Sequence, residues 1–211
     1  MEVPGMEVAE VWRHVEAQRR ALRTHLETLS EDEWAVPSLC AGWAVRDVAA
    51  HVIATPQCGW SDFAAMMVRG GFRFNHAILK EGRRRGRAEP ADILRQYDEY
   101  GAARVTPPGL TPLDPLADVL VHTQDLLRPL GREHEMPREA AAAATERSLR
   151  LGWAFGTRHL GALRWEATDL DWSRGDGPVL RGPIQELLLV ATGRGRAARL
   201  LEGDGLARLG A

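Results

Sequence analysis

Apolar residues recur at helical spacing along most of the chain. In the first segment, residues 8–29, they stand mainly three or four positions apart, at Val8, Val11, Trp12, Val15, Leu22, Leu26 and Leu29. This period is typical of an amphipathic helix rather than of a strand. Ser30 then precedes the acids of SEDEW, which predicts an N-cap followed by a short helix.

Proline and glycine divide the following sequence into further helices. Pro37 and Gly42 precede a helix that contains Val45, Val48 and His51. Pro56 ends or kinks this helix, because its ring removes an intrahelical hydrogen bond and clashes with the preceding turn. The patterning predicts more helices at residues 59–68, 74–85, 90–104, 115–127 and 137–155, and a loop at residues 105–115.

The pattern changes after about residue 159. LRWEATDLDW, residues 163–172, alternates as a strand does, SRGDG at 173–177 predicts a hairpin turn, and PVLRG at 178–182 predicts the returning strand. Pro183 then opens one more helix. We therefore expect a mainly α protein, with a helical bundle over residues 1–158 and a small C-terminal α/β subdomain over residues 159–211.

Composition narrows the class of protein. Of the 211 residues, 45% are hydrophobic and 27% are charged, and the net charge is −2, which favours a globular domain without a nucleic-acid or anionic-membrane partner. RRRGR at 83–87 has no aromatic residues between its arginines, so we interpret it as a solvated helix end. Cys40 and Cys58 form no CxxC pair and indicate a reduced chain rather than a disulfide framework.

The N-terminal segment and the hydropathy pattern predict a cytoplasmic protein. MEVPGMEVAEVWRHVEAQRR carries acids and begins a helical pattern at once, unlike a secretory signal peptide. No apolar run approaches the roughly 20 residues that a membrane-spanning helix needs.

Two Asp-x-x-x-His pairs, Asp47/His51 and Asp118/His122, are the candidate chemistry. Residues four apart share one face of a helix, and imidazole and carboxylate groups that converge inside a bundle can hold a metal ion. The same spacing also fits a simpler interpretation, in which Asp47 caps its helix and each histidine is a surface or hydrogen-bonded residue. Spacing alone leaves both interpretations open.

Four segments add a resemblance to a known family. PSLCAGWAVRDVAAHV at 37–52 resembles the signature of the mycothiol-dependent maleylpyruvate isomerase family, a branch of the DinB-like metal-binding four-helix bundles. The other three resemble actinobacterial members of the same family: RGGFRFNHAI at 69–78, PLADVLVHTQDLLRPLG at 115–131 and LRWEATDLDWSRGDGPVLRGPIQELLLVATGR at 163–194.

The resemblance implies a DinB-like four-helix bundle that carries a divalent metal, usually zinc. The family's ligand positions fall on His51, Asp118 and His122. The isomerase proper has a glutamate where this chain has Asp118, so the metal is open among zinc, nickel, manganese and iron. Asp47 matches a position that is not a ligand, and we assign it to helix capping or to support of His51.

The resemblance also implies mycothiol, or a similar low-molecular-weight thiol, as co-substrate. Three protein ligands on a tetrahedral zinc leave one open position, and a thiol bound there is deprotonated. The thiolate would attack a small electrophile, which gives S-transfer, or isomerisation if the thiol is later expelled. We therefore expect an S-transferase or isomerase whose partners are a thiol and a small electrophile.

Several residues near these segments are candidates for supporting roles. Asp125 either accepts a proton from a ligand imidazole or pairs with Arg128 on the surface. Arg73 and Asn75, together with His76, either line the pocket or, in the case of Asn75, cap a helix. Cys40 precedes His51 by eleven residues, about 16 Å if the chain between them were helical, so we assign it a structural role.

Other functions fit the same residues. A non-catalytic metal-binding bundle is one alternative, because a fold does not establish an activity. A two-His-one-carboxylate iron oxygenase is another. A zinc-dependent partner of a transcription factor would need cysteine ligands near a histidine, which this chain lacks. Residues 160–211 have three open roles: to cover the thiol pocket, to form a homodimer, or to stabilise the bundle.

Overall fold

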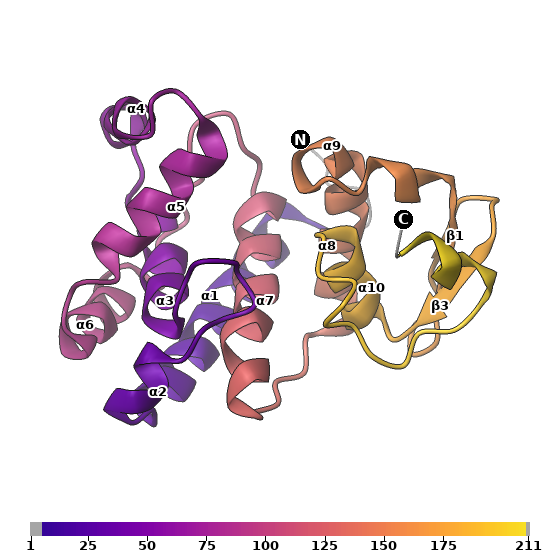
Figure 1. Cartoon of the computed structure of the whole chain (residues 1–211), viewed down its shortest axis with the longest axis horizontal. Coiled ribbons are helices and arrows are strands. Elements are labelled where there is room, and N and C mark those ends of the chain that lie inside the picture. The colour runs from indigo at the N-terminus through magenta and orange to yellow at the C-terminus, as the bar shows by residue number, and fades with distance from the viewer. Residues whose placement is uncertain (1–5, 210–211) are drawn as a thin grey trace. The chain divides into compact units, whose positions relative to one another are not determined.

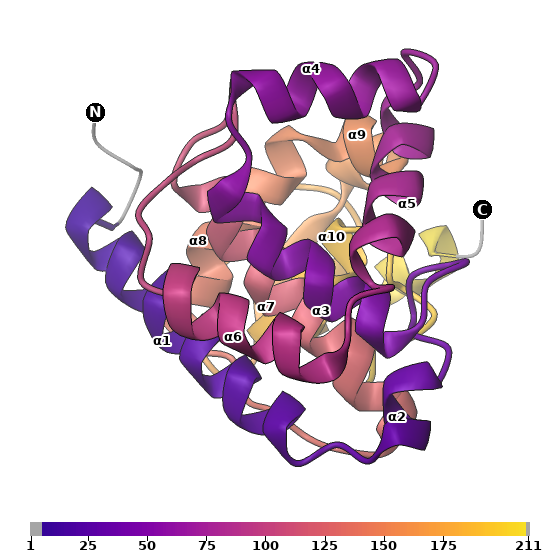
Figure 2. The same ribbon diagram turned by 90° about the vertical axis from the view of Figure 1, so that its left-hand side faces the viewer.

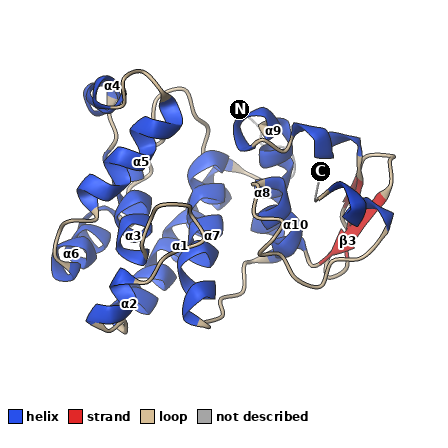
Figure 3. Cartoon of the chain, in the orientation of Figure 1, coloured by secondary structure: helices blue, strands red, loops and turns tan. Residues whose placement is uncertain are grey.

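The regular secondary structure of the described residues is helical apart from one small sheet near the C-terminus (Figure 1, Figure 3). The computed structural model describes residues 6–209 and divides them into two compact units. Glu7–His134 form one unit, and the residues from Glu135 onward form the other together with Met6. Within residues 6–209, no helix is long and apolar enough to cross a membrane.

The first unit consists of helices at nearly the positions that the pattern predicts. They are α1 (Val8–Glu27), α2 (Glu31–Ala35), α3 (Val45–Ala54), α4 (Trp60–Arg69), α5 (Phe74–Arg85), α6 (Pro90–Tyr100) and α7 (Leu113–Leu127), with short 3-10 turns at Thr55–Gln57 and Arg128–Leu130. Ser30 caps α2 as expected, because its hydroxyl accepts from the Glu33 amide and the Glu33 carboxylate accepts from the Ser30 amide.

Four of these helices make the bundle. α1 and α3 each pack against α6 and α7, which closes a ring of four helices around a common core (Figure 2). The core is filled by fully buried apolar side chains, among them Leu22, Val48, Ile53, Ile93 and Leu126. α5 packs on α3 outside this ring, and α4 lies across the end of α5. The predicted helical bundle is confirmed.

The second unit contains the remaining helices and the sheet. Its elements are α8 (Arg138–Arg150), α9 (Gly152–Phe155), α10 (Ile184–Ala191), two 3-10 turns at Arg158–Ala162 and Asp204–Arg208, and strands β1 (Arg164–Ala167), β2 (Ser173–Arg174) and β3 (Val179–Gly182). The helix expected at residues 137–155 is interrupted at Leu151, where the chain leaves α-helical dihedral angles.

The division between units differs from the boundary at residue 158 that the pattern suggested. α8 packs against α10 rather than joining the bundle. The reason is compositional, because α8 buries the alanine run that begins at Ala140 and α10 buries Ile184, Leu187 and Leu188. Small side chains on one helix allow the large side chains of the other to approach closely.

The sheet corrects the hairpin prediction. β1 is central, pairs antiparallel with β2 and pairs parallel with β3, so residues 178–182 are not a returning hairpin strand. The glycines of SRGDG instead allow this segment to lie directly against the backbone of the residues that precede β1. A Cβ on Gly175 or Gly177 would lie within 2.3 Å of the Leu163 or Ala162 carbonyl oxygen, respectively, so both positions need glycine.

Candidate metal centre

Two neighbouring bundle helices bring two imidazoles and a carboxylate together. His51 lies on the last turn of α3, and Asp118 and His122 stand one turn apart on α7. Asp118 Oδ1 lies 3.2 Å from His51 Nε2 and 3.4 Å from His122 Nε2. The ring centroids of the two histidines are 5.0 Å apart and the rings are nearly perpendicular, at 86°.

These separations suit a shared metal ion. Two ligand atoms about 2.0–2.1 Å from a tetrahedral zinc are separated by about 3.3 Å. One donor atom from each of the three residues lies within 4.8 Å of the others. The side chains of His51, Asp118 and His122 are 22%, 21% and 13% exposed, so an ion can enter the cluster from solvent.

Asp118 is held ionised in this cluster. Burial alone would raise the pKa of its carboxyl, but the charge of His51 and hydrogen bonds from both histidines outweigh burial and hold the pKa well below its usual range. Thr55 Oγ1 donates to Asp118 Oδ2 at 3.2 Å, which leaves Oδ1 directed at the imidazoles.

His122 is oriented from its other side by Asp125. The Asp125 side chain is fully buried, and its Oδ2 accepts from His122 Nδ1 at 2.8 Å. Burial disfavours the charged imidazole, yet the hydrogen bonds to Asp118, Asp125 and Cys40 raise the pKa of His122 well above its ordinary value. With Nδ1 donating to Asp125, the Nε2 lone pair faces a carboxylate oxygen, so a cation must lie there, either a proton or a metal ion.

Trp43 covers the two histidines on one side. Its ring centroid lies 5.0 Å from that of His51 and 6.2 Å from that of His122. Its Nε1 donates to the Leu79 carbonyl of α5 at 3.1 Å, and its side chain is buried. Gly82 of α5 makes room for the indole, because a Cβ there would lie 2.4 Å from the ring.

Cys40 lies beside the cluster, which corrects the distance expected from the sequence. Its Sγ is 3.6 Å from His122 Nδ1 and donates to Asp125 Oδ2 at 3.1 Å. The distance of a helical path does not apply, because residues 38–43 form a loop that folds back onto α7. Cys40, His122 and Asp125 form a second group of potential metal-binding side chains.

Most of the predicted supporting residues lie outside the cluster. Asp47 caps α3, with Oδ2 accepting from the Ala44 amide at 3.0 Å. Arg73 is the N-cap residue of α5 and Asn75 lies in its first turn, both exposed, and α5 has no side-chain cap. Asp125 is buried, and its Oδ2 accepts from His122 Nδ1. Thus the structure brings Asp125 to the cluster, but not Arg73 or Asn75.

Thr55 and Arg19 are two neighbours of the site that the sequence analysis missed. The Arg19 side chain is 1% exposed and donates to the Ala103 carbonyl at 3.0 Å. The negative charge of Asp118 favours the charged form of the Arg19 guanidinium group. The sequence does indicate that Arg19 is buried, because Arg19 stands four residues after Val15 and three before Leu22 in the apolar stripe of α1. A charged residue in such a stripe indicates a buried partner.

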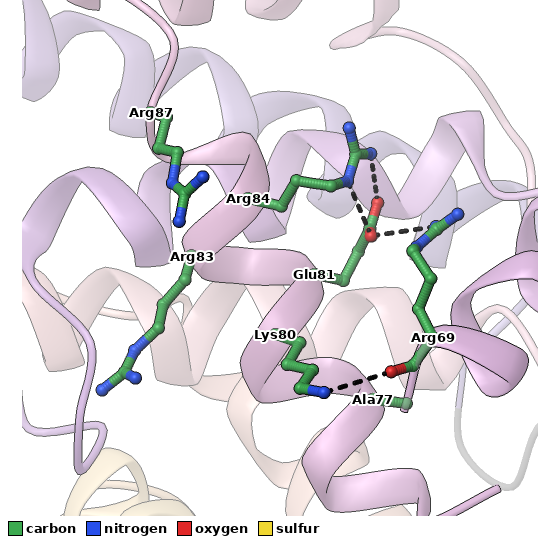
Figure 4. Close-up of a pocket in the computed structure, with 7 residues that line it drawn as sticks. All are labelled: Arg69, Ala77, Lys80, Glu81, Arg83, Arg84 and Arg87. Atoms are coloured by element: carbon green, nitrogen blue, oxygen red, sulfur yellow. Dashed lines mark hydrogen bonds and ion pairs between the residues drawn. The ribbon is translucent and has the colours of Figure 1, made fainter. Parts of the chain in front are cut away.

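A separate hollow lies along α5. It measures about 500 Å³ and is lined by Arg69, Ala77, Lys80, Glu81, Arg83, Arg84 and Arg87 (Figure 4). Glu81 is the acid among these cations. Hydrogen bonds from Arg84, helped by Arg85 and Arg69, lower the pKa of Glu81 to about 2 despite its partial burial. Arg83 instead donates to the Gly42 carbonyl, so the basic run serves helix packing and ion pairing.

The fold and the cluster define a class: helical bundles that present two histidines and a carboxylate to one point. A family model, the mycothiol maleylpyruvate isomerase N-terminal domain, matches residues 15–127, which is more than half of the chain and a range in which the cluster residues lie. The chain belongs to this family, which takes its name from an enzyme.

Solved structures agree on the fold. The crystal structure of the mycothiol-dependent maleylpyruvate isomerase has a TM-score of 0.65 at 14% sequence identity, covering 97% of this chain and 95% of that chain. The crystal structure of a histidine-to-alanine mutant of that isomerase matches with the same values. No curated protein sequence matches the chain significantly.

Proposed function

We propose that this chain is a divalent-metal-dependent enzyme that joins mycothiol, or a similar low-molecular-weight thiol, to a small electrophile. His51, Asp118 and His122 would hold the cation, with zinc as the first choice. The observation that carries this proposal is the convergence of two Nε2 atoms on Asp118 Oδ1, while Asp125 occupies Nδ1 of His122. A cation at this point would supply a Lewis acid that favours the deprotonated form of a thiol.

The chain's own residues prepare the site for that chemistry. Thr55 and Asp125 fix the Asp118 carboxylate and the His122 ring before any ligand binds. Trp43 shields both imidazoles from water on one side, and a lower local dielectric strengthens interactions with charge. Three protein donors leave a tetrahedral ion one further position for a thiol.

The reaction class follows from thiolate chemistry. Attack of the sulfur on one carbon of an activated C=C bond forms a C–S bond as the π bond breaks, and protonation of the resulting carbanion at the other carbon completes an S-transfer by addition. If the C–S bond breaks again after rotation about the former double bond, the thiol is released and the substrate is isomerised. Maleylpyruvate, on which the similar solved enzyme acts by its name, is the first electrophile to assay.

Metal analysis of the wild type beside His51→Ala and His122→Ala tests the site. We expect about one zinc per wild-type chain and at least a 10-fold loss of affinity in each variant. His76→Ala is the matched control, because His76 is an exposed histidine on α5. Equal metal content in all four proteins would contradict the assigned ligands.

Calorimetric titration of the metal-loaded protein with mycothiol tests the thiol. Binding that disappears with the metal supports the enzyme. Metal binding without thiol binding would instead favour a non-catalytic metal-binding bundle. Bound iron together with oxygen consumption would favour the oxygenase.

A further inference from the structure

We propose that Cys40 is a positioning residue that holds Asp125 against His122 and thereby directs His122 Nε2 at the metal. This inference rests on the proposed function, because it concerns the same site. The thiol touches both partners, with Sγ 3.1 Å from Asp125 Oδ2 and 3.6 Å from His122 Nδ1.

The Asp125 carboxylate needs hydrogen-bond donors to hold it in place. The side chain of Asp125 is fully buried, and a buried charge is costly unless donors surround it. Oδ2 accepts from both His122 Nδ1 and Cys40 Sγ. The thiol therefore helps to fix the carboxylate in the position where it orients the imidazole.

The loop of residues 38–43 is also joined to α7 through the backbone of Asp125. The Asp125 carbonyl would ordinarily accept from the amide four residues later, but that residue is Pro129, which has no N–H. The Leu39 amide donates to this carbonyl at 2.9 Å instead. Backbone and side chain of one residue, Asp125, thus bind two adjacent residues of the loop, Leu39 and Cys40.

The loop itself has a fixed shape. The Ser38 amide donates to the Trp43 carbonyl at 2.9 Å, and the Trp43 amide donates to the Cys40 carbonyl at 3.0 Å. Ser38 Oγ also accepts from the Cys40 amide at 3.2 Å, and Gly42 takes a left-handed conformation, with φ +82°. Cys40 is therefore presented by a closed loop rather than by a free segment.

Geometry separates this role from that of a ligand. Cys40 faces Nδ1 of His122, whereas the ion shared with His51 and Asp118 would bind Nε2. The two ring nitrogens point away from each other, so Cys40 cannot join the same ion as His122 Nε2. It acts on the metal through Asp125 and His122.

Metal affinity of three variants, measured by competition with a chromophoric chelator, tests the proposal. Cys40→Ala removes the donor and should weaken zinc binding about 10-fold, the lower end for residues that orient a ligand. Cys40→Ser keeps a hydroxyl donor and should stay within about 3-fold of the wild type. Cys58→Ala is the matched control and should bind as the wild type does. Unchanged affinity in Cys40→Ala would overturn the proposal.

The spectrum of the cobalt-substituted protein separates positioning from ligation. We expect no sulfur-to-cobalt charge-transfer band in the wild type without added thiol, and altered visible bands in Cys40→Ala but not in Cys40→Ser. A charge-transfer band that Cys40→Ser loses would make Cys40 a ligand and overturn the proposal.

Nuclear magnetic resonance of the metal-free protein tests the same role independently of the metal. The His122 Nδ1 proton should be observed in the wild type and in Cys40→Ser, and should exchange rapidly with water in Cys40→Ala. An unchanged signal in Cys40→Ala would overturn the positioning role. Failure of the wild type to bind zinc would refute the proposed function alone.

Discussion

At the scale of single residues, Gly82 sets how closely α5 approaches Trp43. A Cβ at this position would lie 2.4 Å from the indole, which is buried and also bound through Nε1 to Leu79. We expect Gly82→Ala to displace the ring and to lower the free energy of unfolding by about 1–3 kcal/mol, as overpacking does. Chemical denaturation measures this change, and the fluorescence of Trp43 should shift.

Gly161→Ala is the control for the Gly82 substitution. A Cβ on Gly161 meets no atom within 4 Å, so the unfolding free energy should change by less than about 0.5 kcal/mol. Equal effects of the two substitutions would show that contact with Trp43 is not the cause of the loss at Gly82.

The residues of the candidate site differed in how well the sequence could predict them. Asp118 and His122 share a helix, so their spacing alone predicts that they lie on one face. The proximity of Cys40 to His122, 82 positions later, depends on the fold of a loop and on Pro129, which frees the carbonyl that the loop binds. No periodicity carries such information, because loop conformation follows from tertiary hydrogen bonds.

At the scale of helices, Asp47 belongs to the start of α3. Its carboxylate accepts from the Ala44 amide, which has no partner within the helix. Asp47→Ala should lower the free energy of unfolding by about 1 kcal/mol, while zinc content stays that of the wild type. Urea denaturation and metal analysis of the same sample measure the two quantities.

Asp92→Ala is the matched control for the capping prediction. Asp92 stands in the first turn of α6 and forms an exposed ion pair with Arg95. Its removal should change the unfolding free energy by less than about 0.5 kcal/mol. Loss of zinc from Asp47→Ala to the extent seen in His51→Ala would make Asp47 a ligand instead.

His25 and His134 join α1 to the segment after α7 and should make stability fall in acid. His134 Nε2 donates to Gln18 Oε1 at 2.8 Å, so its Nδ1 accepts from His25 Nε2 at 3.3 Å. Burial lowers the pKa of His25, helped by the charge of Arg132, and burial and the charge of His25 lower the pKa of His134.

The lowered pKa values of His25 and His134 determine how stability changes with pH. The folded chain binds protons more weakly than the unfolded chain, so stability is full above the ordinary histidine pKa of about 6.5 and declines as the pH falls through the lowered values. Denaturation midpoints between pH 7 and pH 5 measure the decline, which His134→Asn should reduce. His76→Asn should leave it unchanged, and an equal decline in His134→Asn would contradict this assignment.

Helix positions were predicted more closely than strand connections. The boundaries of α5 match the predicted range, because its apolar period and the adjacent glycines act locally. The parallel pairing of β1 and β3 was missed, because the glycines that suggested a hairpin allow close backbone approach instead. Composition alone does not distinguish these two uses of glycine.

At the scale of the whole molecule, the chain forms two compact units, and the proposed metal would connect only helices of the first. α3 and α7 both belong to the unit Glu7–His134, as do all three proposed ligands. A ligand that binds only the folded state stabilises it by RT ln(1 + [L]/Kd), about 2.7 kcal/mol at 100 times Kd. This stabilisation should therefore be confined to the bundle wherever the units open independently.

Hydrogen exchange followed by mass spectrometry measures that distribution. In saturating zinc, amides of α3 and α7 that exchange by opening of the bundle should slow by about 100-fold, whereas those of β1, β3 and α10 should keep their rates. His122→Ala should remove the effect, because α7 then offers one ligand instead of two. Equal slowing in both units would mean that they open together, and unchanged rates in α3 would place the bound zinc elsewhere.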